Sequence, residues 1–159
     1  MNWVKSLTSD LKLYEDKRVM TFAELLELAR IYKPGLSAQS FRNSLPKILM
    51  TGILEKPAHG VYMNMSLSPK PTPKELAGFI RKGSIISLSS ALAGCGALQK
   101  SSLVTAVIPL SESPNLREVK TDGARFRFYG LPNRFFNGEW MKKDMAYPCF
   151  IPEKALLDW

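Results

Sequence analysis

A stretch near residue 40 carries the side chains best suited to recognising nucleic acid. Arg can fork onto guanine, Asn and Gln can pair with adenine, and Ser and Lys can hold phosphates. All of these types occur between residues 37 and 47, and no acidic residue occurs between Lys33 and Ile53. The spacing predicts a DNA-contacting surface that also includes a following loop. Its predicted residues are Ser37, Gln39, Ser40, Arg42, Asn43, Lys47, Lys56 and His59.

A helix over residues 37–50 would place these groups on one side. Phe41, Leu45 and Ile48 are spaced at helical intervals, so they share an apolar face that should pack inward. Ser37 is a suitable N-cap. Pro46 removes one hydrogen bond, so we expect a kink or a break into two shorter helices there. The opposite, polar face is then left for DNA.

The flanking segments predict a winged helix-turn-helix over residues 1–65. Apolar spacing indicates helices at residues 2–13 and 22–32, and Thr21 with Glu24 forms a capping box. A very short strand is expected at residues 19–20, and two more at 53–56 and 60–63. The loop at residues 57–60 could follow the DNA backbone, although His59 is more simply a solvated turn residue.

A proline-rich segment at residues 66–73 predicts an extended, stiff linker. The remaining residues, 74–159, predict a small mixed α/β domain with a mainly antiparallel sheet, so the fold class is α+β. Strands are expected at 103–110, 116–121 and 125–129, with a hairpin across Asp122-Gly123. We also expect helices at 74–81, 89–93 and 152–159, a strand-like or helix-entry piece at 84–88, and further strands at 135–136 and 139–141.

Arginines and aromatic residues alternate between residues 125 and 129. Phe126 and Phe128 should face the core, and Arg125 and Arg127 should face outward. The two arginines could form a second basic surface for DNA or for an acidic protein face. A solvated sheet face is the interpretation we favour.

The bulk composition favours an acidic partner without requiring one. The chain has 159 residues, 45% of them hydrophobic, and a net charge of +8. A sequence pI of about 9.6 makes nucleic acid the first candidate partner, although a basic protein without a polyanion partner fits as well. The positive charge is shared evenly between residues 1–70 and the rest. One His and two Cys without C-x-x-C spacing predict no metal site, cofactor or disulfide.

The sequence also indicates where the protein works. The N-terminus has no signal-peptide pattern, and no apolar run is long enough to span a membrane. We therefore expect a cytoplasmic protein with no membrane contact.

No catalytic pattern emerges. Gly94-Cys95-Gly96 lacks the remainder of a phosphate-binding loop. Asp122 and Glu139 with Lys142 or Lys143 are the carboxylate–lysine set that a small nuclease would need, but Asp122 is better explained by its turn. Glu153 should stabilise a helix N-terminus, and Asp158 should lie on the surface. We expect a protein that is not an enzyme.

Three segments resemble the AbiEi-type antitoxin family, transcriptional regulators of type IV toxin–antitoxin systems. They are Gly60-Val61-Tyr62 at the end of the predicted winged helix, Ser-x-x-Ser-Ala-Leu at residues 87–92, and Pro-Glu-Lys-Ala-Leu-Leu-Asp at residues 152–158. The strand rich in arginine and aromatic residues also fits. Family members continue beyond the last segment, which implies that the antitoxin-like domain is truncated here; otherwise this short helix must dock firmly.

The resemblance implies two activities. The winged helix would bind operator DNA and repress its own operon, and the second domain would counteract a nucleotidyltransferase-type toxin. The alternative is a protein-interaction module that uses the winged helix as a scaffold. The sequence leaves open whether the protein is a monomer or a dimer.

Overall fold

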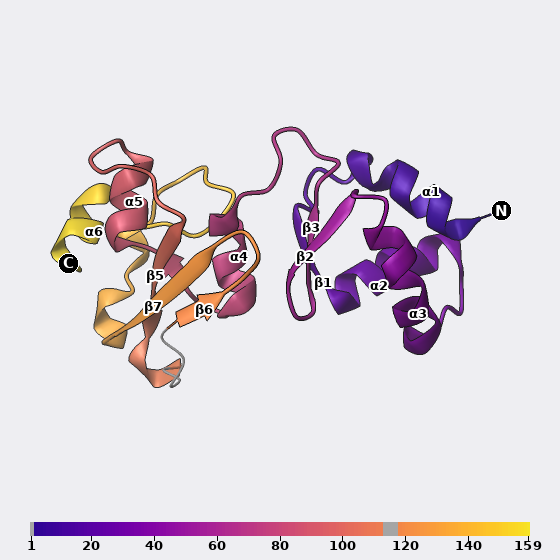
Figure 1. The fold of residues 1–159 in the computed structure, drawn as a ribbon. Helices are drawn as coiled ribbons and strands as arrows, with labels where there is room; N and C mark the ends of the chain where they lie inside the picture. The colour runs from indigo at the N-terminus through magenta and orange to yellow at the C-terminus, as the bar shows by residue number, and fades with distance from the viewer. Residues whose placement is uncertain (1, 113–117) are drawn as a thin grey trace. The chain divides into compact units, whose positions relative to one another are not determined.

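A computed structural model describes residues 2–112 and 118–159 (Figure 1). The chain divides into two compact units, Met1–Thr72 and Pro73–Trp159, which are described separately. Both combine helices with a small sheet, as expected for an α+β protein. Among the described residues, no helix has both the length and the apolar character needed to cross a bilayer.

The first unit contains three helices and a three-stranded sheet. The helices are α1 (Trp3–Asp10), continued by a 3-10 turn η1 (Leu11–Leu13), α2 (Phe22–Tyr32) and α3 (Ala38–Leu49). The strands are β1 (Val19–Thr21), β2 (Leu54–Ala58) and β3 (Val61–Asn64). Their order is β1-β3-β2, with both pairs antiparallel. The helices pack together beside this sheet (Figure 1).

The predicted apolar face of α3 forms the centre of the first core. Phe41 and Ile48 are completely buried, and Leu45 is nearly so. The rings of Trp3 and Phe22 lie 6.1 and 5.5 Å from the ring of Phe41, measured between centroids. Burying such a large side chain stabilises the unit by roughly 1.5–3 kcal/mol. This packing fixes which side of α3 faces outward.

Local hydrogen bonds set the helix boundaries as the sequence predicted. The Thr21 hydroxyl accepts from the backbone N–H of Glu24, and the Glu24 carboxylate accepts from the backbone N–H of Thr21. Ser37 caps α3 in the same way through the N–H of Ser40. The break considered at Pro46 does not occur, because the helix continues to Leu49 and the N–H of Met50 bonds to the Pro46 carbonyl.

The turn between β2 and β3 is shorter than the predicted loop. Strand β2 continues through Pro57 to Ala58, which pairs with Val61, so His59 and Gly60 alone form the turn. Gly60 has a φ of +71°, a conformation that favours glycine. The register shifts between Glu55 and Ala58, which accommodates a proline that cannot donate to the ladder.

The segment after β3 is bent rather than extended, contrary to the sequence prediction. Residues 65–69 form turns and bends, and Leu67 is buried. The Arg18 guanidinium donates to the carbonyls of Pro69 and Lys70 at 3.1 and 3.2 Å. Prolines restrict φ but do not prevent bends, and these hydrogen bonds hold the segment against the first unit.

The second unit is built on a four-stranded mixed sheet. Its strands are β4 (Ile85–Ile86), β5 (Leu103–Pro109), β6 (Glu118–Lys120) and β7 (Arg125–Leu131). The order is β4-β5-β7-β6, with β5 and β7 parallel and the other two pairs antiparallel. The helices are α4 (Pro73–Ile80), α5 (Leu88–Gly94) and α6 (Pro152–Leu157). A 3-10 turn, η2 (Leu110–Glu112), follows β5.

The sequence prediction for this unit holds in part. The hairpin across Asp122-Gly123 is confirmed, because Lys120 pairs with Arg125; residues 116–117 of the predicted strand lie outside the described residues. The strand predicted at 135–136 is wrong, and the one predicted at 139–141 is reduced to an isolated antiparallel bridge between Met141 and Phe150. Most of these residues lie in 3-10 turns, η3 (Asn133–Phe135) and η4 (Gly138–Trp140). Asn137 caps η4 through its side chain, a local bond that competes with a strand.

A buried ion pair anchors α6. Lys154 pairs with Asp158, and both side chains are only 5% exposed. The Ser87 hydroxyl donates to the other Asp158 oxygen at 3.0 Å. The Lys154 ammonium also lies 5.4 and 5.0 Å from the ring centroids of Phe135 and Phe150. The prediction that Asp158 lies on the surface is therefore wrong, because its carboxylate bonds to Lys154 and Ser87 where α6 packs against α5.

Removing the acidic partner should destabilise the second unit. Asp158→Asn would leave the Lys154 ammonium buried without a counter-charge, at a cost of about 3 kcal/mol in the free energy of unfolding. Urea unfolding followed by NMR signals of the second unit would measure this loss. Asp144→Asn, at an exposed carboxylate, is the matched control and should change little. Equal stability of the two variants would contradict a stabilising role for the pair.

Candidate nucleic-acid interface

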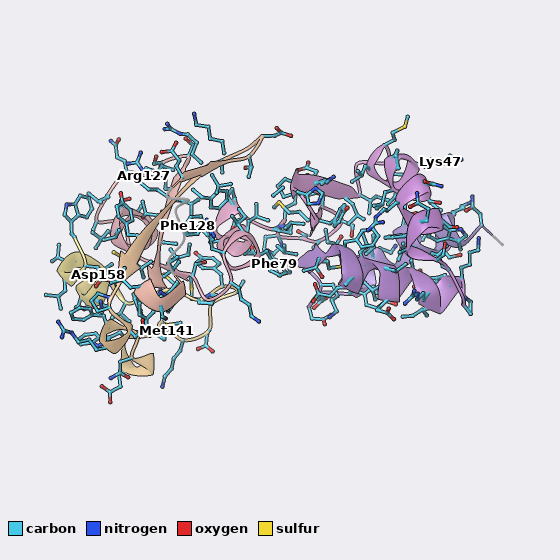
Figure 2. The ribbon with its side chains drawn as sticks, turned by 90° about the horizontal axis from the view of Figure 1, so that it is seen from below. Lys47, Phe79, Arg127, Phe128, Met141 and Asp158 are labelled. Atoms are coloured by element: carbon cyan, nitrogen blue, oxygen red, sulfur yellow. The ribbon has the colours of Figure 1, made fainter. Side chains whose placement is uncertain are left out.

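The polar face of α3 is exposed, as the sequence predicted. Gln39, Ser40, Arg42 and Asn43 are all exposed, and the helix that carries them is regular. Lys47 is exposed one turn further on and appears on the outer side of α3 in Figure 2. This face contains amide, hydroxyl, guanidinium and ammonium groups and no carboxylate.

Serine hydroxyls occupy the N-terminal end of α3. The Ser37 hydroxyl accepts from the backbone N–H of Ser40 at 3.1 Å and donates to the Ser40 hydroxyl at 2.9 Å. Ser37 is therefore used as a cap. The Ser40 hydroxyl stands beside the positive end of the helix dipole, where an anionic oxygen is favoured.

The two amide side chains on this face bond to each other. Gln39 Nε2 donates to Asn43 Oδ1 at 3.1 Å. This bond orders both side chains before any ligand binds. It leaves the Gln39 Oε1 acceptor and the Asn43 Nδ2 donors on two exposed residues, and an acceptor with a donor is the set that matches an adenine edge.

Arg42 is held at the edge of the face by an aromatic ring. Its guanidinium carbon lies 5.0 Å from the ring centroid of Phe22, a cation–π arrangement. Among the described residues, no hydrogen bond or ion pair engages this guanidinium. Stacking uses a face of the group, so the N–H donors at its rim stay available.

A groove separates α3 from the β2–β3 turn. It encloses about 380 Å³ and is lined by Phe22, Arg42, Leu45, Pro46, Leu49, Lys56, His59, Gly60 and Tyr62. Lys56 and His59, the two residues predicted in the turn region, therefore face the same space as Arg42. Burial raises the pKa of Tyr62, and the Arg42 charge partly offsets this rise. The tertiary structure thus brings Arg42 of α3 together with Lys56 of β2 and His59 of the turn around an apolar floor.

The aromatic and apolar part of this groove was not predicted from the sequence. Phe22 packs on Phe41 and also supports Arg42. Pro46 was treated as a disturbance, yet it lines the groove. The sequence signal for a surface role of Phe22 is its position directly after the capping residue Thr21, because the first turn of a helix often remains at a surface.

The second predicted basic surface is only partly available. Arg125 is exposed, but Arg127 donates to the Glu118 carboxylate at 3.1 Å. That hydrogen bond and the Arg127 charge hold the pKa of Glu118 below its ordinary value. Phe126 and Phe128 face the core, with Phe126 completely buried. The contacts of Arg125 and Arg127 therefore fit an ordinary, outward-facing side of the sheet better than a continuous cationic patch.

The second unit also contains a buried polar cluster. The Thr105 hydroxyl donates to the Ser87 carbonyl at 2.7 Å and accepts from the Ser90 N–H at 3.0 Å. Cavities of about 250 and 270 Å³ both border Asp158. These polar groups bond mainly to one another, so the cluster is consistent with a structural role. Within residues 2–112 and 118–159, no group of His, Cys, Asp and Glu is arranged to hold a metal ion.

The fold is similar to a crystal structure of the RV2827C protein from Mycobacterium tuberculosis, with a TM-score of 0.63 at 16% sequence identity. The similarity covers 99% of this chain and 59% of that protein. The present chain thus spans less than two thirds of that protein's length, and at this identity the similarity concerns the fold alone. No protein-family model matches the chain, and no curated protein matches its sequence.

The Arg127–Glu118 contact predicts a pH effect. Because the folded-state pKa of Glu118 is lowered, its pairing contributes stability above the ordinary pKa of 4.5 and loses it as pH falls through the lowered value. An NMR titration should find the Glu118 midpoint below 4.5. Arg127→Gln should raise that midpoint more than Arg125→Gln does. An unshifted midpoint in the unaltered protein would refute the contact.

Proposed function

We propose that the first unit is a winged helix-turn-helix that binds double-stranded DNA. In this arrangement α3 enters the major groove, and the β2–β3 turn follows the phosphate backbone. The observation that carries the proposal is the exposed, acid-free polar face of α3, opposite the buried Phe41. A chain with a net charge of +8 adds a general attraction to DNA.

Each exposed group has a definite role in this proposal. The Gln39–Asn43 amide pair contacts an adenine edge, and Arg42 contacts guanine from its support on Phe22. Ser40 and Lys47 bind phosphates from the helix, and Lys56 and His59 do so from the turn region. These last contacts position the protein and carry no sequence information.

We further propose that the protein is a cytoplasmic regulator of antitoxin type, which represses its own operon and counteracts a nucleotidyltransferase-type toxin. The support is the resemblance of short motifs to the AbiEi-type family. Two of these motifs, at residues 87–92 and 152–158, are distant in sequence but meet through the Ser87–Asp158 hydrogen bond. Neither a cofactor nor a catalytic reaction is part of this proposal.

One observation favours the alternative, a protein-interaction module. Leu156, Leu157 and Trp159 at the end of the second unit are 65%, 75% and 72% exposed. A cluster of large exposed apolar side chains is typical of a protein-binding surface. This surface and the α3 face lie in different units, so partner binding and DNA binding can be tested separately.

Single substitutions on α3 should weaken DNA binding selectively. A specific site would first be selected from random duplex DNA with the unaltered protein. Arg42→Ala and Asn43→Ala should then each cost about 1–3 kcal/mol on that site and relax sequence preference at one position. Lys47→Ala should weaken binding to all sequences alike and reduce its salt dependence. Fluorescence anisotropy at several salt concentrations would measure all three effects.

Lys12→Ala is the matched control, because Lys12 is exposed in the same unit but lies in η1, outside the proposed interface. Its DNA affinity should fall only by the small effect of one lost charge. Unchanged binding in both Arg42→Ala and Asn43→Ala would exclude α3 as the DNA-contacting helix. Failure to select any duplex would exclude sequence-specific binding altogether.

The toxin partner can be tested in cells. Cells inhibited by a nucleotidyltransferase encoded in the adjacent reading frame should grow again when this protein is expressed with it. Leu157→Glu should reduce this rescue without weakening DNA binding. Glu153→Gln, an exposed change on the same helix α6, should keep the rescue. A toxin that remains fully toxic beside the unaltered protein would refute the antitoxin role and leave the DNA proposal standing.

A further inference from the structure

The groove between α3 and the β2–β3 turn has a floor that DNA contacts alone do not explain. Phe22, Leu45 and Leu49 supply apolar surface there, and Pro46 extends it. Phosphates and base edges require hydrogen-bond partners, so they gain little from such a floor. Its volume of about 380 Å³ falls within the range of small-molecule pockets.

The rim of the same groove is cationic. Arg42 and Lys56 contribute positive charges, His59 contributes an imidazole, and no carboxylate lines the groove. The Arg42 guanidinium is positioned over Phe22, and none of the described residues engages its donors. A planar fork of this kind matches a carboxylate with two parallel hydrogen bonds. The groove thus combines an apolar slot with a fixed anion-binding group at its edge.

We propose that this groove binds a small aromatic carboxylate. The aromatic ring lies against Leu49 and Pro46 beside Phe22, and the carboxylate pairs with Arg42, with Lys56 close by. Charge complementarity selects an anion, and the apolar floor selects an aromatic body over a bare inorganic ion. This assignment stands on the groove itself and does not depend on DNA binding.

The consequence for regulation rests on the proposed function. Arg42 is both the carboxylate-binding group and a proposed base-contacting residue. A bound aromatic carboxylate therefore occupies a group that DNA needs, and it adds negative charge next to the phosphate backbone. The two ligands compete, which makes the protein an effector-responsive DNA-binding protein.

The test is titration of the full chain with 2-naphthoate, followed by ¹⁵N–¹H NMR in the absence of DNA. Saturable shifts should centre on the amides of Phe22, Leu49 and Tyr62, with a dissociation constant on the order of 1 mM or tighter. The neutral isostere 2-naphthamide should bind about fivefold more weakly, as expected for loss of one exposed charge pair. Acetate, which lacks the aromatic body, should give no saturable shift in the groove.

Matched variants locate the site. Arg42→Gln keeps a long polar side chain but removes the charge, and it should weaken naphthoate binding about fivefold. Lys47→Gln removes a charge from the same helix outside the groove and should leave naphthoate binding unchanged. Equal affinity for naphthoate and naphthamide, an unaffected Arg42→Gln variant, or shifts confined to the second unit would each overturn the site.

Competition is measured separately on a selected duplex. Naphthoate should raise the apparent dissociation constant for DNA, and Arg42→Gln should need about fivefold more naphthoate for the same proportional increase. Simultaneous binding of both ligands without mutual weakening would overturn the competition. Absence of DNA binding together with intact naphthoate binding would refute the proposed DNA function and leave the ligand site established.

Discussion

The burial of Phe41 is the constraint on which the first unit depends. This ring is completely enclosed and is packed by the rings of Trp3 and Phe22. Because side chains on a helix have fixed angular positions, turning Phe41 inward also turns Gln39 and Asn43 outward. The same apolar contact that stabilises the fold therefore presents the polar face. No other interaction is needed to expose the candidate site.

Phe22 links that core to the charged edge of the site. It packs on Phe41 and also contacts the Arg42 guanidinium, which follows Phe41 directly in the sequence. A guanidinium held on a ring loses less conformational freedom on binding a ligand than one free in water. The aromatic core thus extends to the rim of the groove, where it gives a flexible cation a defined position.

The second unit adds a buried charge pair to its apolar core. Isolated buried charges are strongly destabilising, and Lys154 is tolerated because Asp158 and two aromatic rings surround it. Ser87, which lies near the beginning of the unit's sequence, donates a further hydrogen bond to Asp158. The pair stabilises little compared with apolar residues of equal size, but it fixes where α6 docks, because other positions would leave charges unpaired.

The local sequence was sufficient to predict a structural feature wherever the residues that determine this feature lie within a few positions of one another. The Thr21–Glu24 capping box, the Ser37 cap, the periodic face of α3 and the Asp122-Gly123 hairpin all depend on such contacts. Contacts between distant segments were decided by the tertiary structure. These include the parallel β5–β7 pairing, the bend after β3, the convergence of Arg42 with the β2–β3 turn, and the burial of Asp158. The physical reason is that these contacts form only when separate apolar faces pack together, and no short pattern encodes which distant residues then become neighbours.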